Sequence, residues 1–250
     1  MLLKVSRSHV PKHIAVVFPL KMWKKPSRSE VWKAYYDNKM QIQVQDTLQD
    51  VARLSKWCAT LSIPELTVYD PHGILYSVFT DLSCHLKSDT LLQMEHSQSS
   101  IEVTVCMRPN NDPSARRAFP IYAPISDEAL AEYRRHSDSF LPRLRLNVLS
   151  AKQDKLTLVE AASQLDNERV TPFALHEALL AQDVMTCDPD MVVVCGDRTD
   201  PLELYRFPCW AIRLADIHSL PYYSLIGKWT EQQFLDTLRH YSRAEQRFGA

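Results

Sequence analysis

The sequence contains little glycine and no long apolar run. Only four of its 250 residues are glycine, and neither the GxGxxG nor the P-loop pattern for phosphate binding occurs. A GxSxG motif is also missing, so nothing indicates a dinucleotide-binding domain or an α/β-hydrolase. No apolar stretch is long enough to span a bilayer, and no secretory signal is recognised. We therefore expect either a soluble protein or one whose anchor lies upstream.

Metal-binding patterns are missing as well. His9 and His13 are four residues apart, but Pro11 between them disfavours the helix that would bring them to one face. The six cysteines form no CxxC pair and have no metal-ligand spacing with histidine. Several lie in apolar segments, where a free thiol behaves as a small hydrophobe. We expect reduced, buried cysteines and a protein that faces the cytosol. The cysteines are Cys58, Cys84, Cys106, Cys187, Cys195 and Cys209.

Charge of one sign does not dominate. The formal net charge is −1, with 24% charged and 45% apolar residues, which is ordinary globular usage. No overall field favours nucleic acid, so we expect no nucleic-acid partner. The length suits one α/β domain with an ample core.

Apolar periodicity predicts strands that alternate with helices. This alternation predicts a single α/β domain over residues 1–250, with a mainly parallel central sheet flanked by helices. Thr171 before Pro172 is typical of a helix start, and Thr230 with Gln233 matches a capping box. The expected strands are 13–18, 66–69, 101–107, 144–149 and 191–195, with 210–217 a further candidate. The expected helices are 44–61, the seventies to 94, 155–165, 172–185 and one that opens at 230.

Two features are ambiguous in this pattern. Trp57 lies on the polar side of the helix over 44–61, where it makes either a second contact within the fold or an interface. Residues 108–124 contain four prolines and several turn residues, so they are expected to form a loop. The stretch 108–143 is a candidate variable insertion.

Ligands of open α/β sheets bind beyond the carboxyl ends of the strands. After the first strand, Phe18-Pro19-Leu20-Lys21 offers no carboxylate or amide for Mg²⁺. Asp70-Pro71-His72-Gly73 is typical of a turn, with an acid–base pair as the alternative. Gly196-Asp197-Arg198 is either a solvated loop or a charged site. None of these segments predicts a self-sufficient catalytic site.

The C-terminal end carries the clearest anion-binding signal. At about 100° per residue, Arg239, Arg243 and Arg247 lie opposite the apolar stripe that contains Phe234. Gly249 follows close behind. Arginine supplies a fork of donors, and glycine lets the backbone approach a phosphate closely. We expect a phosphate clamp at this end, with a solvated basic helix face as the alternative.

Several segments, in order and spanning nearly the whole chain, match one family. They are 11–15 (PKHIA), 53–58 (RLSKWC), 68–73 (VYDPHG), 190–194 (DMVVV), 207–214 (FPCWAIRL) with Leu220-Pro221, and 245–249 (EQRFG). The chain resembles the Nogo-B receptor family, the non-catalytic subunit of the cis-prenyltransferase (dehydrodolichyl diphosphate synthase) complex. The resemblance implies the fold of undecaprenyl diphosphate synthase, a cis-prenyltransferase.

The resemblance also implies a subunit that is inactive alone. Catalytic members carry a Mg²⁺-binding aspartate after the first strand, where this chain has Pro19-Leu20-Lys21. They carry a diphosphate-binding arginine after the late strand, where it has Val194-Cys195-Gly196. A carboxylate is needed for Mg²⁺, and arginine grips diphosphate. The complex condenses isopentenyl diphosphate onto farnesyl diphosphate, making long-chain polyprenyl diphosphate for dolichol synthesis and protein glycosylation.

The family contributes an RxG motif that enters the partner's active site. The tail 247–250 fits this motif: the resemblance implies that Arg247 binds the diphosphate of isopentenyl diphosphate and that Gly249 closes over the phosphate–Mg²⁺ cluster. Phe248 lies between them, at the variable position of this substrate-binding segment. The Mg²⁺ is held mainly by the partner, and no metal site is expected in this chain alone.

The segment 207–214 corresponds to the superfamily's dimerisation region. Its interface candidates are Trp210, Ile212, Arg213 and Leu214, with ordinary core as the alternative. The implied location is the cytosolic face of the endoplasmic reticulum membrane, although this chain has no transmembrane segment. Two other functions remain open: a homodimeric prenyltransferase with altered ligands, and a non-enzymatic receptor or scaffold module.

Overall fold

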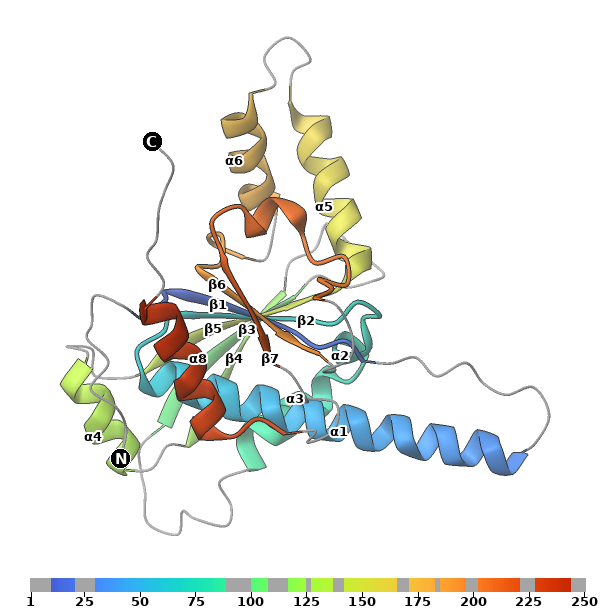
Figure 1. The fold of residues 1–250 in the computed structure, drawn as a ribbon, viewed down its shortest axis with the longest axis vertical. Helices are drawn as coiled ribbons and strands as arrows, with labels where there is room; N and C mark the ends of the chain where they lie inside the picture. Colours follow the sequence, from blue (N-terminus) through green and yellow to red (C-terminus); the bar gives the residue numbers. More distant parts are fainter. Residues whose placement is uncertain are drawn as a thin grey trace.

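A seven-stranded, strongly twisted sheet lies at the centre of the part that the computed structural model describes (Figure 1). The described residues are 10–20, 30–88, 100–107, 117–124, 127–136, 142–165, 171–182, 185–196, 202–220 and 228–243. The strand order is β4-β3-β5-β2-β1-β6-β7. The strands are β1 His13–Val17, β2 Glu65–Tyr69, β3 Ser100–Met107, β4 Arg117–Pro124, β5 Arg143–Leu149, β6 Met191–Cys195 and β7 Asp216–Leu220.

Neighbouring strands are parallel except for the antiparallel pair β3–β4. Every residue of β1, β2 and β6 is buried. Strands buried on both faces need apolar residues on both sides, which explains the nearly continuous hydrophobic sequences of β1 and β6. The prediction of a single α/β domain with a mainly parallel sheet is confirmed.

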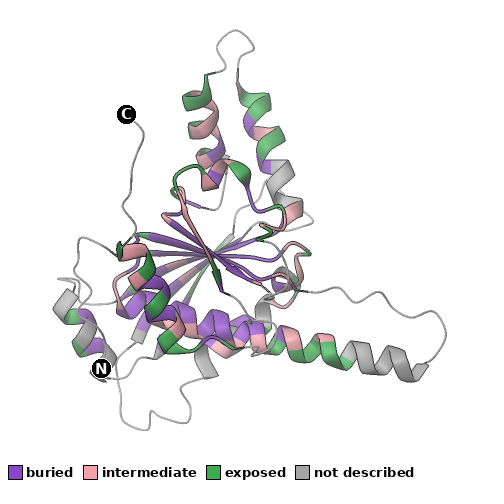
Figure 2. Ribbon diagram, viewed as in Figure 1, coloured by how far each residue is buried: buried purple, intermediate pink, exposed green. Residues whose placement is uncertain are grey.

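Helices cover both faces of the sheet (Figure 1). One face carries α1 Glu30–Thr60, α3 Phe79–Ser88 and α8 Glu231–Arg243. The other carries α5 Ala151–Gln164, α6 Pro172–Gln182 and the 3₁₀ helix η2 Cys209–Ile212. The described part of the chain also contains the short helices α2 Ile74–Ser77 and α4 Asp127–His136. Figure 2 shows the buried residues concentrated in the sheet and in the parts of α1 and α8 that face it.

Two of the expected elements are wrong. The predicted loop 108–124 contains β4 over Arg117–Pro124. Pro120 is tolerated there because β4 is an edge strand of the described sheet, so a missing N–H costs no ladder bond on its open side. The predicted strand 210–217 is instead η2 followed by β7, which starts at Asp216. Pro208 precedes η2, and its carbonyl accepts a hydrogen bond from Ala211 N at 3.1 Å.

Helix boundaries differ in two further places. α1 begins at Glu30 rather than near 44, and its first turns extend beyond the sheet (Figure 1). The helix expected through the seventies is divided at Val78 into α2 and α3. Residues 89–94 lie outside the described part. Helix α4 lies within 108–143, where no helix was expected.

Helix α8 is attached to α1 by aromatic and polar contacts. The rings of Trp57 and Phe234 stack with centroids 5.5 Å apart, which confirms the interpretation of Trp57 as a contact within the fold. Asp50 Oδ1 accepts hydrogen bonds from Trp229 N at 2.9 Å and from Arg53 Nη1 at 3.0 Å. These contacts fix α8, the helix that leads into the C-terminal tail.

The caps expected for two helices are present. Gln233 N donates to Thr230 Oγ1 at 3.2 Å, and Thr230 N donates to Gln233 Oε1 at 2.9 Å. This reciprocal pair is the predicted capping box. Thr171 Oγ1 accepts from Ala174 N at 3.1 Å at the start of α6. In the described part of the chain, no helix combines the length and apolar character needed to cross a bilayer.

Candidate functional site

The carboxyl edge of the sheet offers little to a divalent cation. Phe18 and Leu20, which follow β1, are apolar and buried. Ser150 follows β5 and Gly196 follows β6. Of the described residues that directly follow β1, β2, β5 and β6, only Asp70 carries a carboxylate. This edge is where an open α/β fold binds its ligand, so the state of Asp70 decides what the edge can do.

Asp70 is a turn residue rather than a free ligand. Its Oδ1 accepts from His72 N at 2.9 Å, and its Oδ2 accepts from Leu75 N at 3.0 Å and from Ile74 N. The following Gly73 has φ +73°, a left-handed conformation that glycine adopts without strain. Burial raises the pKa of Asp70, and the N–H donors oppose that shift. The interpretation of Asp70-Pro71-His72-Gly73 as a turn is confirmed, and the carboxylate is already occupied by backbone donors.

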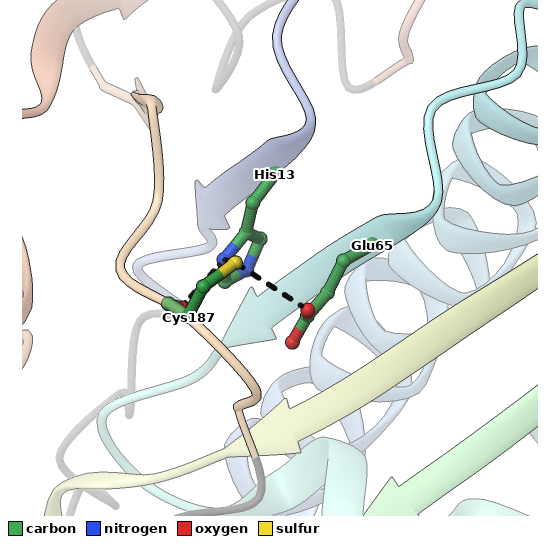
Figure 3. A group of neighbouring side chains, drawn as sticks. All are labelled: His13, Glu65 and Cys187. Atoms are coloured by element: carbon green, nitrogen blue, oxygen red, sulfur yellow. Dashed lines mark hydrogen bonds between the residues drawn. The ribbon is translucent and has the colours of Figure 1, made fainter. Parts of the chain in front are cut away.

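The amino ends of the same strands hold a buried polar cluster. The register places His13 of β1 beside Glu65 of β2, and Ala15 beside Thr67. Thr67 in turn lies beside Asn147 of β5. Figure 3 shows His13 and Glu65 converging on Cys187, which lies in the segment before β6. His13, Glu65, Thr67 and Asn147 are all buried, while Cys187 is exposed.

The hydrogen bonds of this cluster assign its protons. His13 Nδ1 is 2.9 Å from the carbonyl oxygen of Cys187, so Nδ1 must donate. The other ring nitrogen, Nε2, therefore accepts from Thr67 Oγ1 at 2.7 Å in the neutral ring. Asn147 Nδ2 donates to Thr67 Oγ1 at 3.1 Å and to Glu65 Oε1 at 2.6 Å. Each of these N–H and O–H groups has one acceptor, and this arrangement requires a neutral His13 ring.

Glu65 collects the remaining donors. Thr186 N donates to its Oε1 at 2.9 Å, and the hydroxyl of Thr186 donates to Oε2. The Cys187 thiol lies 3.7 Å from Oε2. Arg145 Nε is 4.0 Å from Oε1, which places a positive charge beside the carboxylate. Both carboxylate oxygens of Glu65 are therefore hydrogen-bonded, as a buried polar group requires.

His13, Glu65 and Cys187 are chemically able to hold a metal ion. One potential ligand atom from each lies within 4.8 Å of the others, and histidine, carboxylate and thiolate are zinc ligands. However, both nitrogens of His13 are already hydrogen-bonded. Partial burial and the charge of Glu65 raise the pKa of the Cys187 thiol to about 11, so the thiol is protonated at neutral pH. The arrangement fits a hydrogen-bonded clamp between strands better than a metal centre.

Sequence reasoning did not predict this cluster. His13 and Asn147 are polar residues inside otherwise apolar strands, and Glu65 opens a buried strand. A polar residue at a buried strand position is the only local signal available, because the partners are 52 or more positions apart in sequence.

The structure describes only part of the predicted site. Arg247, Phe248 and Gly249 lie outside the described residues, as do residues 197–201 after Gly196. Of the interface candidates, Trp210 and Ile212 are partly buried and pack against the core on the α5–α6 face. Leu214 is 58% exposed, and Arg213 Nη2 lies 3.3 Å from Asp188 Oδ2. Trp210 and Ile212 therefore fit the core interpretation, and an interface role for this segment stays a prediction.

The cysteines are free, as expected, but only half are buried. Cys58, Cys106 and Cys195 lie in the core, and burial raises the pKa of each thiol. The expectation of burial is wrong for Cys84, Cys187 and Cys209, which are exposed. These three lie in or beside loops and helix surfaces, where a cysteine is not enclosed by neighbouring strands.

Comparison with known proteins relates the chain to one group of subunits. It is 27% identical over 216 residues to the human protein named dehydrodolichyl diphosphate synthase complex subunit NUS1. It is 24% identical over 210 residues to the Schizosaccharomyces pombe subunit of that name and 27% identical over 206 residues to the mouse one. The alignments cover 84%, 82% and 81% of this chain, but 64%, 71% and 61% of those proteins. The chain thus spans less than two thirds of the human and mouse proteins. No family profile matches it.

Solved structures give the same fold at lower identity. Lavandulyl diphosphate synthase from Lavandula x intermedia superposes with a TM-score of 0.56 at 15% identity, covering 97% of this chain and 100% of that one. A probable undecaprenyl diphosphate synthase from Campylobacter jejuni gives 0.50 at 14% identity, covering 96% and 99%. The expected cis-prenyltransferase fold is therefore confirmed. The three curated relatives confirm that the chain is similar, over most of its length, to the Nogo-B receptor family.

Proposed function

We propose that this chain is the accessory subunit of a heteromeric cis-prenyltransferase. In this complex a catalytic partner condenses isopentenyl diphosphate onto farnesyl diphosphate, and the long-chain polyprenyl diphosphate product supplies dolichol synthesis and protein glycosylation. The names of the relatives support the complex, since all three are subunits of a dehydrodolichyl diphosphate synthase complex. The complex acts at the cytosolic face of the endoplasmic reticulum membrane.

One observation carries the assignment of an accessory role. Beyond β1, where an active cis-prenyltransferase needs a Mg²⁺-binding aspartate, this chain has the buried apolar residues Phe18 and Leu20. The neighbouring carboxylate, Asp70, is already occupied by three backbone N–H groups. A hard cation needs free oxygen ligands. The partner therefore holds the Mg²⁺, and this chain is inactive alone.

The C-terminal RxG tail completes the partner's site. Arg247 binds the diphosphate of isopentenyl diphosphate, Gly249 closes over the phosphate–Mg²⁺ cluster, and Phe248 lies between them in the substrate-binding segment. The attachment of α8 to α1 through Trp57, Phe234 and Asp50 supports this role, because it fixes the helix from which the tail extends.

Reconstitution of both chains tests the proposal. Activity should require both, and Arg247→Ala should lower kcat/KM for isopentenyl diphosphate by about 30–150-fold, since one charge-assisted diphosphate contact is worth about 2–3 kcal/mol. Arg247→Lys keeps the charge but loses the paired guanidinium donors, so its kcat/KM should lie between those of the wild type and Arg247→Ala. Arg143→Ala is the matched control, because Arg143 lies at the amino end of β5 and its side chain is 76% exposed. Turnover by this chain alone, or full activity after deletion of 247–250, would contradict the proposal; the second result would favour a receptor or scaffold module.

A further inference from the structure

A cavity of about 650 Å³ lies between the edge strand β7 and helix α8. Its charged and titratable lining consists of His218 from β7 and of Asp236, Arg239, His240 and Arg243 from α8. Arg239 and Arg243 are one helical turn apart, so they lie on the same side of α8. They belong to the basic stripe of the last helix, which the proposed role of the tail leaves without a function.

The cations of this cavity are only partly neutralised. Arg239 is paired with Asp236 on the same helix. His240 Nδ1 lies 3.5 Å from Asp216 Oδ2. In the described part of the chain, Arg243 has no acidic partner. With both histidines neutral, the two arginines balance Asp236 and Asp216, and each protonated histidine adds one positive charge.

The two histidines are in direct contact. The ring centroids of His218 and His240 are 4.7 Å apart, so two imidazolium ions here repel each other unless an anion lies beside them. Burial and the neighbouring His240 lower the pKa of His218, while Asp216 opposes the shift. An anion in the cavity removes the repulsion, so binding and proton uptake are coupled.

We propose that this cavity binds a phosphate or diphosphate group through Arg239, Arg243 and the imidazole pair of His218 and His240. Guanidinium groups present paired donors that match phosphate oxygens, and an imidazolium adds a charge-assisted donor. The proposal does not depend on the function of the tail. A free diphosphate and the phosphate headgroup of a lipid share this chemistry, so the experiment separates the two sources.

Calorimetric titration of the full chain with sodium pyrophosphate tests the site. Binding should be at least about tenfold tighter at about pH 6 than at about pH 7.5, with net proton uptake in buffers of different ionisation enthalpy. Arg243→Ala and His240→Gln should each weaken binding about tenfold or more, and His240→Gln should also reduce the proton uptake. Arg243→Lys should restore part of the affinity. Arg143→Ala and a chain lacking 247–250 should bind like the wild type.

A second experiment tests for a lipid headgroup. It measures sedimentation of the protein with phosphatidylcholine vesicles, with and without about 30% phosphatidic acid. Binding that needs the acidic lipid and is lost in Arg243→Ala identifies a headgroup, whereas pyrophosphate binding alone identifies a free diphosphate. Either result supports the site if the variants fold, as measured by circular dichroism. The proposal is wrong if neither ligand binds, or if binding survives both Arg243→Ala and His240→Gln. Loss of binding only on deletion of 247–250 would assign the anion to the tail and would also overturn it.

Discussion

His13 is the residue whose environment is most completely defined. One ring nitrogen donates to the carbonyl of Cys187, and the other accepts from Thr67. A second proton on the ring would face the hydroxyl of Thr67, which would then have to turn its own proton away. Burial lowers the pKa of His13 below its ordinary value of 6.5, although Glu65 and Asp190 oppose the shift. Burial therefore outweighs the two carboxylates and favours the neutral ring.

Because His13 is buried as a neutral ring, we expect the protein to lose stability in mild acid. Below pH 6.5 the unfolded chain binds a proton that the folded chain does not, so the free energy of unfolding falls as the pH drops toward the folded-state pKa. Each such histidine contributes a slope of at most about 1.4 kcal/mol per pH unit. Denaturant unfolding between about pH 7.5 and 5.5 should show this slope. His218, whose pKa is also lowered, adds to it with the same sign.

Substitution separates the contribution of His13. The His13→Gln chain should have a shallower slope than the wild type, whereas His72→Gln, at an exposed turn position, should keep the wild-type slope. An unchanged slope in His13→Gln would mean that the buried ring accepts a proton in the folded state.

At the scale of the element, α8 is held by its aromatic contacts with α1. Phe234 is 2% exposed and stacks on Trp57, and Trp229 meets it edge to face with ring centroids 6.4 Å apart. Phe234→Ala should therefore lower the free energy of unfolding by about 3–5 kcal/mol, measured by chemical denaturation. Phe173→Ala on α6, at a position 69% exposed, should change it by no more than about 0.5 kcal/mol. Equal effects would mean that α8 is not anchored through this ring.

Fully buried strands were predicted from the sequence more accurately than the edge strand. The central strands β1, β2 and β6 were predicted within one residue, because their complete burial makes them mainly apolar. The caps of α6 and α8 were predicted because capping is a local hydrogen bond between near neighbours. Edge strand β4 was missed because its prolines resemble loop chemistry, and only its pairing with β3 makes it a strand.

The candidate site could be predicted only where its chemistry is local in sequence. The turn at Asp70 and the lack of a free carboxylate after β1 follow from adjacent residues. The His13–Glu65–Cys187 cluster and the cavity between His218 and α8 arise from strand register and helix docking, which join distant positions. The basic stripe of α8 was recognised from its spacing, but β7, which supplies the opposite wall of the cavity, was predicted in the wrong place.

At the scale of the whole molecule, the proposed catalytic partner must bind to a surface of this chain, and the 207–214 segment is the expected contact. The 207–214 segment shows two kinds of residue: Trp210 and Ile212 pack against the core, whereas Leu214 is 58% exposed. Substitutions at the first two would therefore mix folding with association. Leu214 separates the two effects, because an exposed leucine contributes little to the stability of the chain alone.

Leu214→Asp should change the free energy of unfolding of the isolated chain by no more than about 0.5 kcal/mol. If Leu214 lies in the interface, association buries an unpaired carboxylate, which costs several kcal/mol, so the affinity for the catalytic subunit should fall at least about tenfold. Leu202→Asp, at a position 54% exposed and outside the 207–214 segment, is the matched control. Co-purification or biolayer interferometry with the catalytic subunit measures the difference. Wild-type affinity of Leu214→Asp would remove Leu214 from the interface. An equal loss in both variants would mean that the contact extends beyond 207–214, because the two leucines then share one covered surface.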